Sequence, residues 1–350
     1  MNAPGPMHFW TDRLADRGEI FPHQIDLIQD NLLLAELSAS DIEAASFLDQ
    51  RVLTPTTKTG WVPWQLVADI ISRMPESKAP GFIFHVGHCG STLVSRLLGF
   101  AENTQSLREP VPLRILAQDF ANVSEGRSFL GSQALLDRLQ VLMKMWGRGS
   151  RNTVIKATSI CTDLLPQIVH LRPAARFVFM YNRPETHIAT LLAGQNAVAD
   201  LKGMARFRIQ RVQQITGLDL HLSQLSIGQL AALSWLSETT SMARSLENGV
   251  QHIDLLEFEL LLQNPRKVLS RLMHHFGIDA SAATVEKAVQ SPVLQNYSKA
   301  PEHQYNAQTR TAILADARSR FKRDIEQALD WIDKLASRSD IVAESLSRFS

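Results

Sequence analysis

The sequence predicts an α/β fold, with a mostly parallel sheet of about five strands and helices on both of its faces. Two observations carry this prediction. Short apolar runs, typical of buried strands, alternate along the chain with longer stretches of helical periodicity. One of these strands also leads through a glycine-containing turn directly into a helix. The five expected strands lie at residues 81–86, 104–110, 151–158, 177–181 and 250–259, the last range including a turn.

Composition narrows the class of protein. The chain has 350 residues, of which 45% are hydrophobic and 20% charged, as in soluble globular proteins. Its 36 basic and 35 acidic residues give a net charge of +1, so no global field attracts nucleic acid or acidic membranes. No apolar run reaches the ~18 residues of a membrane span, and the N-terminus lacks a signal-peptide pattern. Two cysteines make no disulfide framework and no zinc spacing, which favours a cytoplasmic protein without a structural metal.

The segment from Gly81 to Leu98 organises the chain. An apolar strand breaks at Gly87 and Gly90 and continues into a helix whose first residues are Ser91 and Thr92. Backbone N–H groups at such a junction are uncovered where the helix dipole is positive, which favours a phosphate or sulfate. The ATP-binding form of this loop needs a lysine before the hydroxyl residue, and none occurs between Gly81 and Phe100.

This segment resembles the 5′-phosphosulfate loop of PAPS-dependent P-loop sulfotransferases, in a divergent bacterial-type form. The family pattern is a basic residue followed by Ser-Gly-Thr-Thr-Leu. Aligned without gaps, the matching positions are His88, Cys89, Gly90, Ser91 and Thr92, with His88 where the family has lysine or arginine. The resemblance implies a sulfotransferase-like three-layer fold and binding of PAPS, or its product PAP, by this loop from Gly87 to Thr92.

Two further strand ends carry candidate catalytic residues. Glu109 lies at the end of the second strand, and Lys156 lies in the Lys-Ala-Thr that ends the third. The carboxyl ends of parallel strands in such a sheet face the same crevice. Several sulfotransferase branches carry a glutamate at the first of these positions, as the base that deprotonates the acceptor. The resemblance therefore implies that Glu109 is the base and that Lys156, with His88, stabilises the departing phosphate.

The fourth strand resembles the segment that binds the 3′-phosphate of the nucleotide in this family. Alignment on Pro184 places Asn182 at the family's arginine and Thr190 at its serine, with Arg183 one residue late. A shift of one residue at a strand end reverses the direction of a side chain. The basic run at residues 202–211 is therefore a second source of cations, and Arg206 and Arg208 are the residues that we expect to replace the missing arginine.

The remaining segments flank this core. Residues 1–75 show helical patterns at 8–17, 22–36, 40–49 and 64–74, and we expect a helical N-terminal extension. Residues 76–300 form the expected sulfotransferase-like domain, in which Lys299 stands near the position of the family's nucleotide clamp. Residues 301–350 are expected to hold a last helix, roughly 311–336, packed on the same domain.

Three functions stay open from the sequence. The leading one is sulfonyl transfer from PAPS to a hydroxyl or amine of an unidentified small molecule or peptide, without magnesium. An ATP-dependent phosphotransferase on the same scaffold would need Glu109 or Asp254 to hold magnesium. A catalytically reduced nucleotide- or partner-binding protein is the third possibility, because His88 and Asn182 stand where the family has cations. The sequence names neither the acceptor nor the oligomeric state.

Overall fold

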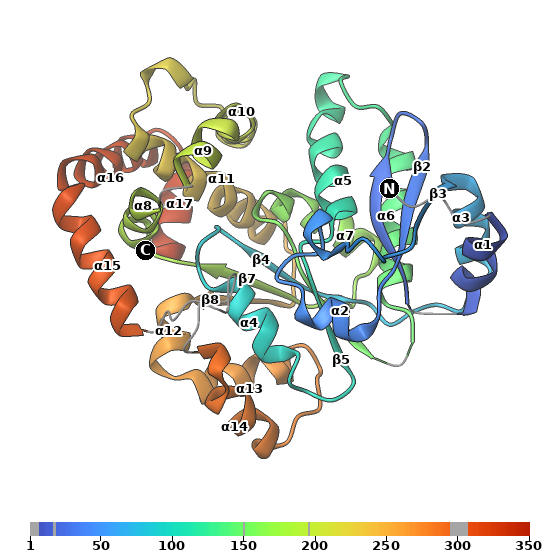
Figure 1. The fold of residues 1–350 in the computed structure, drawn as a ribbon. Helices are drawn as coiled ribbons and strands as arrows, with labels where there is room; N and C mark the ends of the chain where they lie inside the picture. Colours follow the sequence, from blue (N-terminus) through green and yellow to red (C-terminus); the bar gives the residue numbers. More distant parts are fainter. Residues whose placement is uncertain (1–6, 17–18, 150, 195–196, 295–306) are drawn as a thin grey trace.

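The computed structural model describes residues 7–16, 19–149, 151–194, 197–294 and 307–350. The position of Lys299 lies outside these residues. Two sheets organise the chain: a three-stranded antiparallel sheet near the N-terminus and a five-stranded sheet at the centre (Figure 1).

The central sheet confirms the predicted fold class. Its strands run in the order β5-β6-β4-β7-β8, and every neighbouring pair is parallel. All five lie where the sequence predicts a strand. β4 and β7 are short apolar runs, whereas β5 is mostly polar, with Leu107 as its one apolar residue. The bounds are β4 Gly81–His85, β5 Thr104–Arg108, β6 Asn152–Lys156, β7 Phe177–Tyr181 and β8 Ile253–Glu257.

Helices cover both faces of this sheet, for a topological reason. The chain leaves the central strand β4 toward the β5 edge and later passes from β6 across β4 to β7. Because such crossovers are right-handed, the helices of these two connections lie on opposite faces. The connecting elements are α4 Ser91–Leu98 on one face, and α5 Val111–Ala121, α6 Ser132–Trp146, η3 Ser159–Leu164, α7 Leu165–Leu171, α8 Pro184–Ala193, α9 Ala197–Gly203, α10 Ala205–Thr216 and α11 Ile227–Glu247 from the connections that run the other way.

The C-terminal part adds helices to both sides. After β8, α12 Phe258–Gln263, α13 Pro265–His275 and α14 Ala282–Gln290 follow, and α13 and α14 pack on α4. The single last helix expected from the sequence is instead three helices: α15 Ala307–Arg320, α16 Lys322–Ala336 and α17 Asp340–Phe349. The chain leaves helical geometry at Phe321, whose φ is −110°, so α15 and α16 run in different directions (Figure 1).

The N-terminal part is not the helical extension expected from the sequence. Helices α1 Met7–Asp16 and α3 Trp64–Ser72 match predicted patterns, but residues 20–36 form a hairpin of two antiparallel strands. The remaining elements are β1 Ile20–Asp26, β2 Asn31–Glu36, α2 Ala39–Ala44, η1 Gln50–Val52 and β3 Thr59–Pro63. The helix predicted over 22–36 is therefore wrong, and the helix at 40–49 ends at Ala44.

Local turn chemistry explains the hairpin. One carboxylate oxygen of Asp26 accepts the N–H groups of Ile28 and Gln29, each at 2.9 Å, which turns the chain at the end of β1. Asp30 then adopts a left-handed φ of 53° before β2 begins. In β2, Leu32 and Leu34 are buried on the same face, as the two-residue period of a strand requires.

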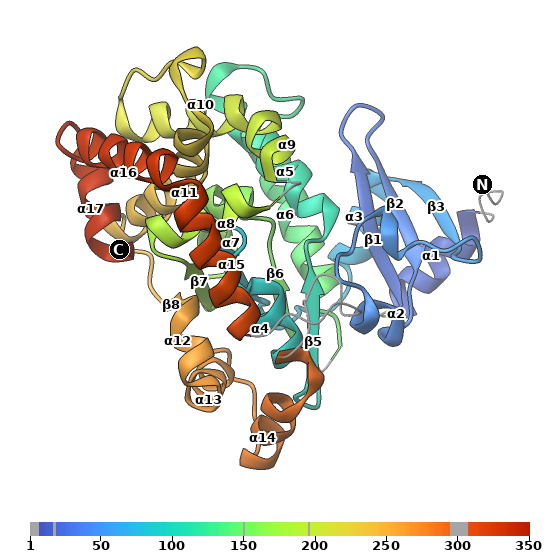
Figure 2. The same cartoon turned by 60° about the vertical axis from the view of Figure 1, so that its left-hand side comes forward.

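The N-terminal sheet packs on the side of the core that carries α5 and α6 (Figure 2). Arg148, after α6, ties the two together, because its guanidinium donates to the carbonyl oxygens of Leu14 at 2.7 Å and Ile20 at 2.6 Å. The division into residues 1–75, 76–300 and 301–350 stays a prediction. Of the helices in the described part of the chain, none is both long and apolar enough to span a membrane.

Candidate functional site

The turn between β4 and α4 has an unusual backbone. Gly87, His88 and Gly90 have φ values of 85°, 51° and 70°, in the left-handed region that favours glycine. At Gly90 the side chain is excluded sterically as well, since a Cβ atom there would lie 2.0 Å from the ring of Phe258. A Cβ on Gly87 would instead meet no described atom within 4 Å, so this part of the turn faces open space.

Neighbouring strands hold this turn in place. The Nδ1 atom of His85 accepts the Gly87 N–H at 2.9 Å, so Nε2 carries the proton and donates to the carbonyl oxygen of Ala157 at 2.9 Å. On the other side, the thiol of Cys89 donates to the carbonyl oxygen of Met180 at 3.3 Å. The side chain of Cys89 therefore points into the protein, and only its backbone is available to a ligand of the turn.

Asn182 belongs to this support as well. Its side-chain amide donates to the carbonyl oxygen of His88 at 3.2 Å, and its own carbonyl oxygen accepts the indole N–H of Trp235 at 3.0 Å. Its Oδ1 atom is buried and has no hydrogen-bond partner among the residues that the structure describes. Asn182 thus contacts the turn directly, at the position where the sequence comparison expected an arginine.

The first turn of α4 presents unsatisfied polar groups. Ser91 and Thr92 are 4% and 2% exposed, and the N-cap Gly90 has no side chain that could accept a hydrogen bond from the first N–H groups. The hydroxyl of Thr92 is buried, and within the described ranges it makes no hydrogen bond. Such a hydroxyl is costly unless a ligand satisfies it, and the positive end of the helix favours an anion there.

Glu109 and Lys156 meet at the carboxyl ends of β5 and β6. The ammonium group of Lys156 forms an ion pair with the Glu109 carboxylate, and the Glu109 N–H donates to the Lys156 carbonyl oxygen at 2.7 Å. The Lys156 side chain is 1% exposed and that of Glu109 is 21% exposed. Glu109 has a left-handed φ of 54°, which turns the chain away from the sheet directly after β5. The structure therefore brings together two of the three candidate catalytic residues.

Arg108 points away from Glu109, as the alternation of a strand requires. Its guanidinium donates to the carbonyl oxygens of Ile42, Glu43 and Ala45 at 2.5, 2.7 and 2.7 Å. These bonds hold the end of α2 against β5.

The segment after α2 brings an aromatic side chain to the strand ends. The ring of Phe47 lies near two cations, with the Arg51 guanidinium 4.0 Å and the Lys156 ammonium 5.7 Å from its centroid. Sequence reasoning missed both Phe47 and Arg51, because they lie far before the strands in the chain and form no motif with them.

Three of the residues expected to bind the 3′-phosphate, Arg183, Thr190 and Arg208, have side-chain partners within the chain. Arg183 is at the N-cap of α8, its side chain is 61% exposed, and it pairs with Glu257 at 2.9 Å. The Thr190 hydroxyl donates to the carbonyl oxygen of Thr186, in its own helix, at 2.7 Å. Arg206 is exposed on α10, and Arg208 is buried and paired with Asp200 at 2.8 Å.

A buried histidine links Arg208 to the turn. Burial, followed by the nearby charges of His88 and Arg208, lowers the pKa of His187 to about 3. The Nε2 atom of His187 hydrogen-bonds the Ser234 hydroxyl at 2.9 Å, and for its buried Nδ1 atom the described chain offers no partner. The charge of Arg208 and the charge of His88 in the turn therefore both act on the same buried imidazole.

A buried ionic cluster supports the segment that follows Lys156. Arg211 pairs with Asp163 at 2.5 Å and with Glu238 at 2.9 Å, and it also donates to the carbonyl oxygen of Ile160 in η3. Burial raises the pKa of Glu238 to about 7. This cluster fixes η3 against α10 and α11. Its basic member lies in the run that the sequence singled out, but the acidic partners gave no signal.

Together these features define a parallel α/β protein in which a glycine-containing turn joins the central strand to a helix, with an ion pair between a buried lysine and a partly exposed glutamate at the ends of β5 and β6. In the described ranges no group of three or more His, Cys, Asp or Glu side chains is placed to hold a metal ion.

Known proteins match this chain by structure and not by sequence. No protein-family profile and no curated protein sequence matches the chain. Among solved structures, the sulfotransferase domain from the curacin biosynthetic pathway is similar at 14% identity and a TM-score of 0.39, over 73% of this chain and 99% of that one. The sulfotransferase domain of the Synechococcus PCC 7002 olefin synthase is similar at 15% identity and a TM-score of 0.41, over 75% and 96%. A sulfotransferase from Mycobacterium avium is similar at 13% identity and a TM-score of 0.40, over 92% and 98%.

Proposed function

We propose that this protein is a sulfotransferase that transfers a sulfonyl group from PAPS to a hydroxyl or amine of an acceptor small molecule or peptide. The observation that carries the proposal is that two features lie at the carboxyl ends of the strands of the sheet. One is the β4–α4 turn with the unpartnered Thr92 hydroxyl, and the other is the Glu109–Lys156 ion pair at the ends of β5 and β6. An anion-binding turn beside a carboxylate base suits the transfer of an anionic group to a protic acceptor.

The turn fits the phosphosulfate end of this donor. The N–H groups from Gly87 to Thr92 and the hydroxyls of Ser91 and Thr92 would hold it, and the open space at Gly87 leaves room for it. When bound, PAPS supplies a sulfonyl group attached to a phosphate leaving group. For its 3′-phosphate we propose Asn182, Arg183, Thr190, Arg206 and Arg208, with the condition that Arg183 leaves Glu257 to bind it.

In the proposed reaction Glu109 is the base. The acceptor oxygen or nitrogen attacks sulfur, its proton passes to the Glu109 carboxylate, and the electron pair of the broken S–O bond stays on the phosphate. Protonation of Glu109 removes the counter-charge of Lys156. The Lys156 ammonium, together with His88, is then available to stabilise the phosphate as its negative charge develops. The ion pair thus links proton removal to leaving-group stabilisation.

Binding of nucleotides tests the donor. Isothermal titration calorimetry of the full chain with PAP, ATP and ADP, each with and without magnesium, separates the functions that the sequence left open. We expect tight PAP binding that does not need magnesium. ATP binding that requires the metal would indicate a phosphotransferase instead, and no binding of any of the three would indicate a protein without nucleotide-dependent activity.

Turnover tests the base. PAP formation from PAPS, measured with a panel of phenols and amines, is expected to fall by about 10²- to 10⁴-fold in Glu109→Gln, while PAP affinity is retained. Glu102→Gln changes an exposed glutamate just before β5 and is the matched control. An unchanged rate in Glu109→Gln would rule out Glu109 as the base.

We also place the enzyme in the cytoplasm, because Cys89 and Cys161 are both buried free thiols, as a reducing compartment allows.

A further inference from the structure

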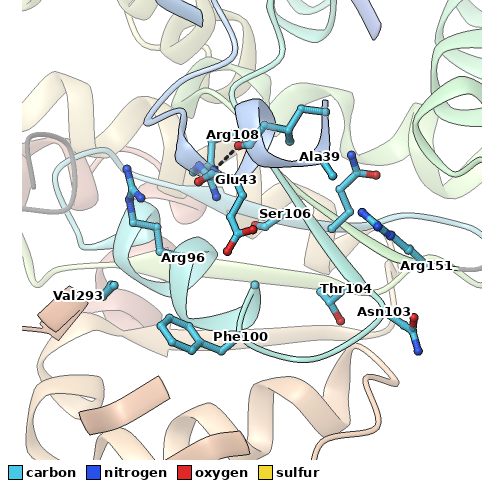
Figure 3. Close-up of a pocket in the computed structure, with 13 residues that line it drawn as sticks. Ala39, Glu43, Arg96, Phe100, Asn103, Thr104, Ser106, Arg108, Arg151 and Val293 are labelled. Atoms are coloured by element: carbon cyan, nitrogen blue, oxygen red, sulfur yellow. Dashed lines mark hydrogen bonds between the residues drawn. The ribbon is translucent and has the colours of Figure 1, made fainter. Parts of the chain in front are cut away.

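A cavity of about 410 Å³ lies beside β5, away from the β4–α4 turn (Figure 3). β5 is the edge strand of the central sheet, so its outer side has no neighbouring strand in that sheet. The cavity is bounded by residues of α2, by the C-terminal end of α4 and by β5 itself. Its volume lies within the range of about 300–1,000 Å³ that is usual for small-molecule sites.

The lining of this cavity is strongly basic. Arg96, Arg108 and Arg151 contribute three positive charges, and Glu43 contributes the one negative charge. Arg108 is 2% exposed, and in the described part of the chain neither Arg108 nor Arg151 forms an ion pair. Burial and the like charge of Arg96 lower the pKa of Arg108 to about 10, so an added anion would relieve unfavourable electrostatics. Guanidinium groups bind carboxylates and phosphates with paired hydrogen bonds.

Polar groups on the same wall narrow the chemistry of the ligand. Thr104 lines the cavity, and its buried hydroxyl has no hydrogen-bond partner among the described residues. Glu43 extends into the cavity near Ser106 (Figure 3). The Ser106 hydroxyl is already hydrogen-bonded to that of Ser95 at 2.6 Å. A carboxylate accepts hydrogen bonds and repels anions, so Glu43 calls for a ligand that also carries a donor.

We propose that this cavity binds a small organic anion that carries at least two carboxylate or phosphate groups together with a hydroxyl or amine donor. The acidic groups lie against Arg96 and Arg151, and the donor lies against Glu43. The buried Arg108, whose Nε and Nη2 atoms already donate to α2 carbonyl oxygens, adds its positive charge. This site is separate from the β4–α4 turn, since β6 lies between β5 and β4 in the sheet. The proposal does not depend on the proposed sulfotransferase activity.

Amide hydrogen exchange on the full chain locates the binding. Citrate, with three carboxylates and a hydroxyl, is the probe for carboxylate ligands, and pyrophosphate is the probe for phosphate ligands. Sodium chloride at matched ionic strength is the reference. We expect citrate to slow exchange in residues 39–46 and 103–108 beyond the sodium chloride reference. Slowing by pyrophosphate in the same two segments would extend the site to phosphates. If pyrophosphate slows exchange only in residues 86–92, it binds the β4–α4 turn and not this cavity. The cavity would then be a site for carboxylates alone.

Matched variants identify the residues. Arg151 is exposed, so Arg151→Gln does not disturb the core, and we expect it to lower citrate affinity about tenfold by calorimetry, the equivalent of one charged hydrogen-bonded contact. Arg323→Gln changes an exposed arginine on α16 and should leave the affinity unchanged. Tricarballylate lacks only the hydroxyl of citrate. We expect the wild type to bind tricarballylate more weakly than citrate, and we expect Glu43→Gln to bind the two with equal affinity. Unchanged exchange at both segments with citrate, or equal citrate affinity in Arg151→Gln and the wild type, would overturn the proposal.

Discussion

Lys156 and Glu109 are joined twice, once through their backbones and once through their side chains. The Glu109 N–H donates to the Lys156 carbonyl oxygen at 2.7 Å, and the Lys156 ammonium forms an ion pair with the Glu109 carboxylate. The ammonium is almost fully buried, whereas the carboxylate is partly exposed. The carboxylate is thus the member of the pair that solvent reaches, and it compensates a charge that would be costly alone.

A double-mutant cycle measures that compensation. We expect Glu109→Gln to lower the free energy of unfolding by about 3 kcal/mol, because the buried Lys156 ammonium loses its ion pair with the Glu109 carboxylate. Glu109→Gln combined with Lys156→Met should lose less than the sum of the two single variants, with a coupling of at least about 1 kcal/mol in urea denaturation. The exposed pair of Arg318 and Glu185 is the control, with an expected coupling below about 0.5 kcal/mol. Additive losses at Glu109 and Lys156 would show that the buried charge is compensated elsewhere.

Gly90 is expected to tolerate no side chain. In Gly90→Ala the new methyl group meets the ring of Phe258 and adds strain at a φ of 70°, so we expect a loss of more than about 2 kcal/mol in unfolding free energy. Gly217→Ala is the matched control: its φ is 71° and no described atom lies near the new methyl group, so only the backbone strain of about 1 kcal/mol applies. Equal losses in the two variants would show that Phe258 moves aside freely.

The Thr92 hydroxyl is expected to serve a ligand and not the fold. Thr92→Val removes a buried hydroxyl that has no partner in the described chain, so stability should stay the same or rise by up to about 1 kcal/mol. PAP affinity, measured by calorimetry, should fall about fivefold to tenfold.

Thr153→Val gives the contrast for this prediction. Its hydroxyl donates to the carbonyl oxygen of Trp146 at 3.0 Å, so this variant should lose about 1 kcal/mol of stability with PAP affinity unchanged. A destabilised Thr92→Val with normal PAP affinity would contradict the assignment of Thr92 to the ligand.

The central sheet could be predicted from the sequence because each of its strands carries its own local signal. β4 and β7 are unbroken apolar runs with aromatic residues, buried on both faces, and only a parallel sheet covered by helices needs such strands. The N-terminal sheet could not be predicted in this way. The Leu32–Leu34 run fits a helix as well as a strand, and the side chain of Asp26, which makes the turn, reveals its role only through its hydrogen bonds.

The candidate site likewise has parts that could be predicted from the sequence and parts that could not. The β4–α4 turn and the two strand ends are local features, and the sequence located Glu109 and Lys156 at one edge. The ion pair joins two residues that lie 47 positions apart in the chain. The contact between the Phe47 ring and Lys156 joins residues that lie 109 positions apart. The hydrogen bonds from Arg108 to the end of α2 place Phe47 there, and no sequence pattern encodes such a contact.

His187 is expected to make the protein sensitive to acid. Burial lowers its pKa to about 3 in the folded state, whereas a histidine in the unfolded chain titrates near 6.5. Between these values the unfolded state binds one more proton, so the contribution of His187 to stability is complete above about pH 6.5 and is lost as the pH falls toward 3, by about 1.4 kcal/mol per pH unit. Urea denaturation at pH 4, 5, 6 and 7 should therefore show His187→Gln gaining on the wild type at each step downward. The slope of the stability difference against pH is the test, because glutamine also changes the hydrogen bond to Ser234 by an amount that does not depend on pH.

Glu238, whose pKa is raised to about 7, changes stability with pH in the opposite direction. It is present in both proteins, so its effect cancels from the difference between them. A difference between His187→Gln and the wild type that stays constant from pH 7 to 4 would mean that His187 becomes protonated in the folded protein, with solvent or a ligand reaching its Nδ1 atom.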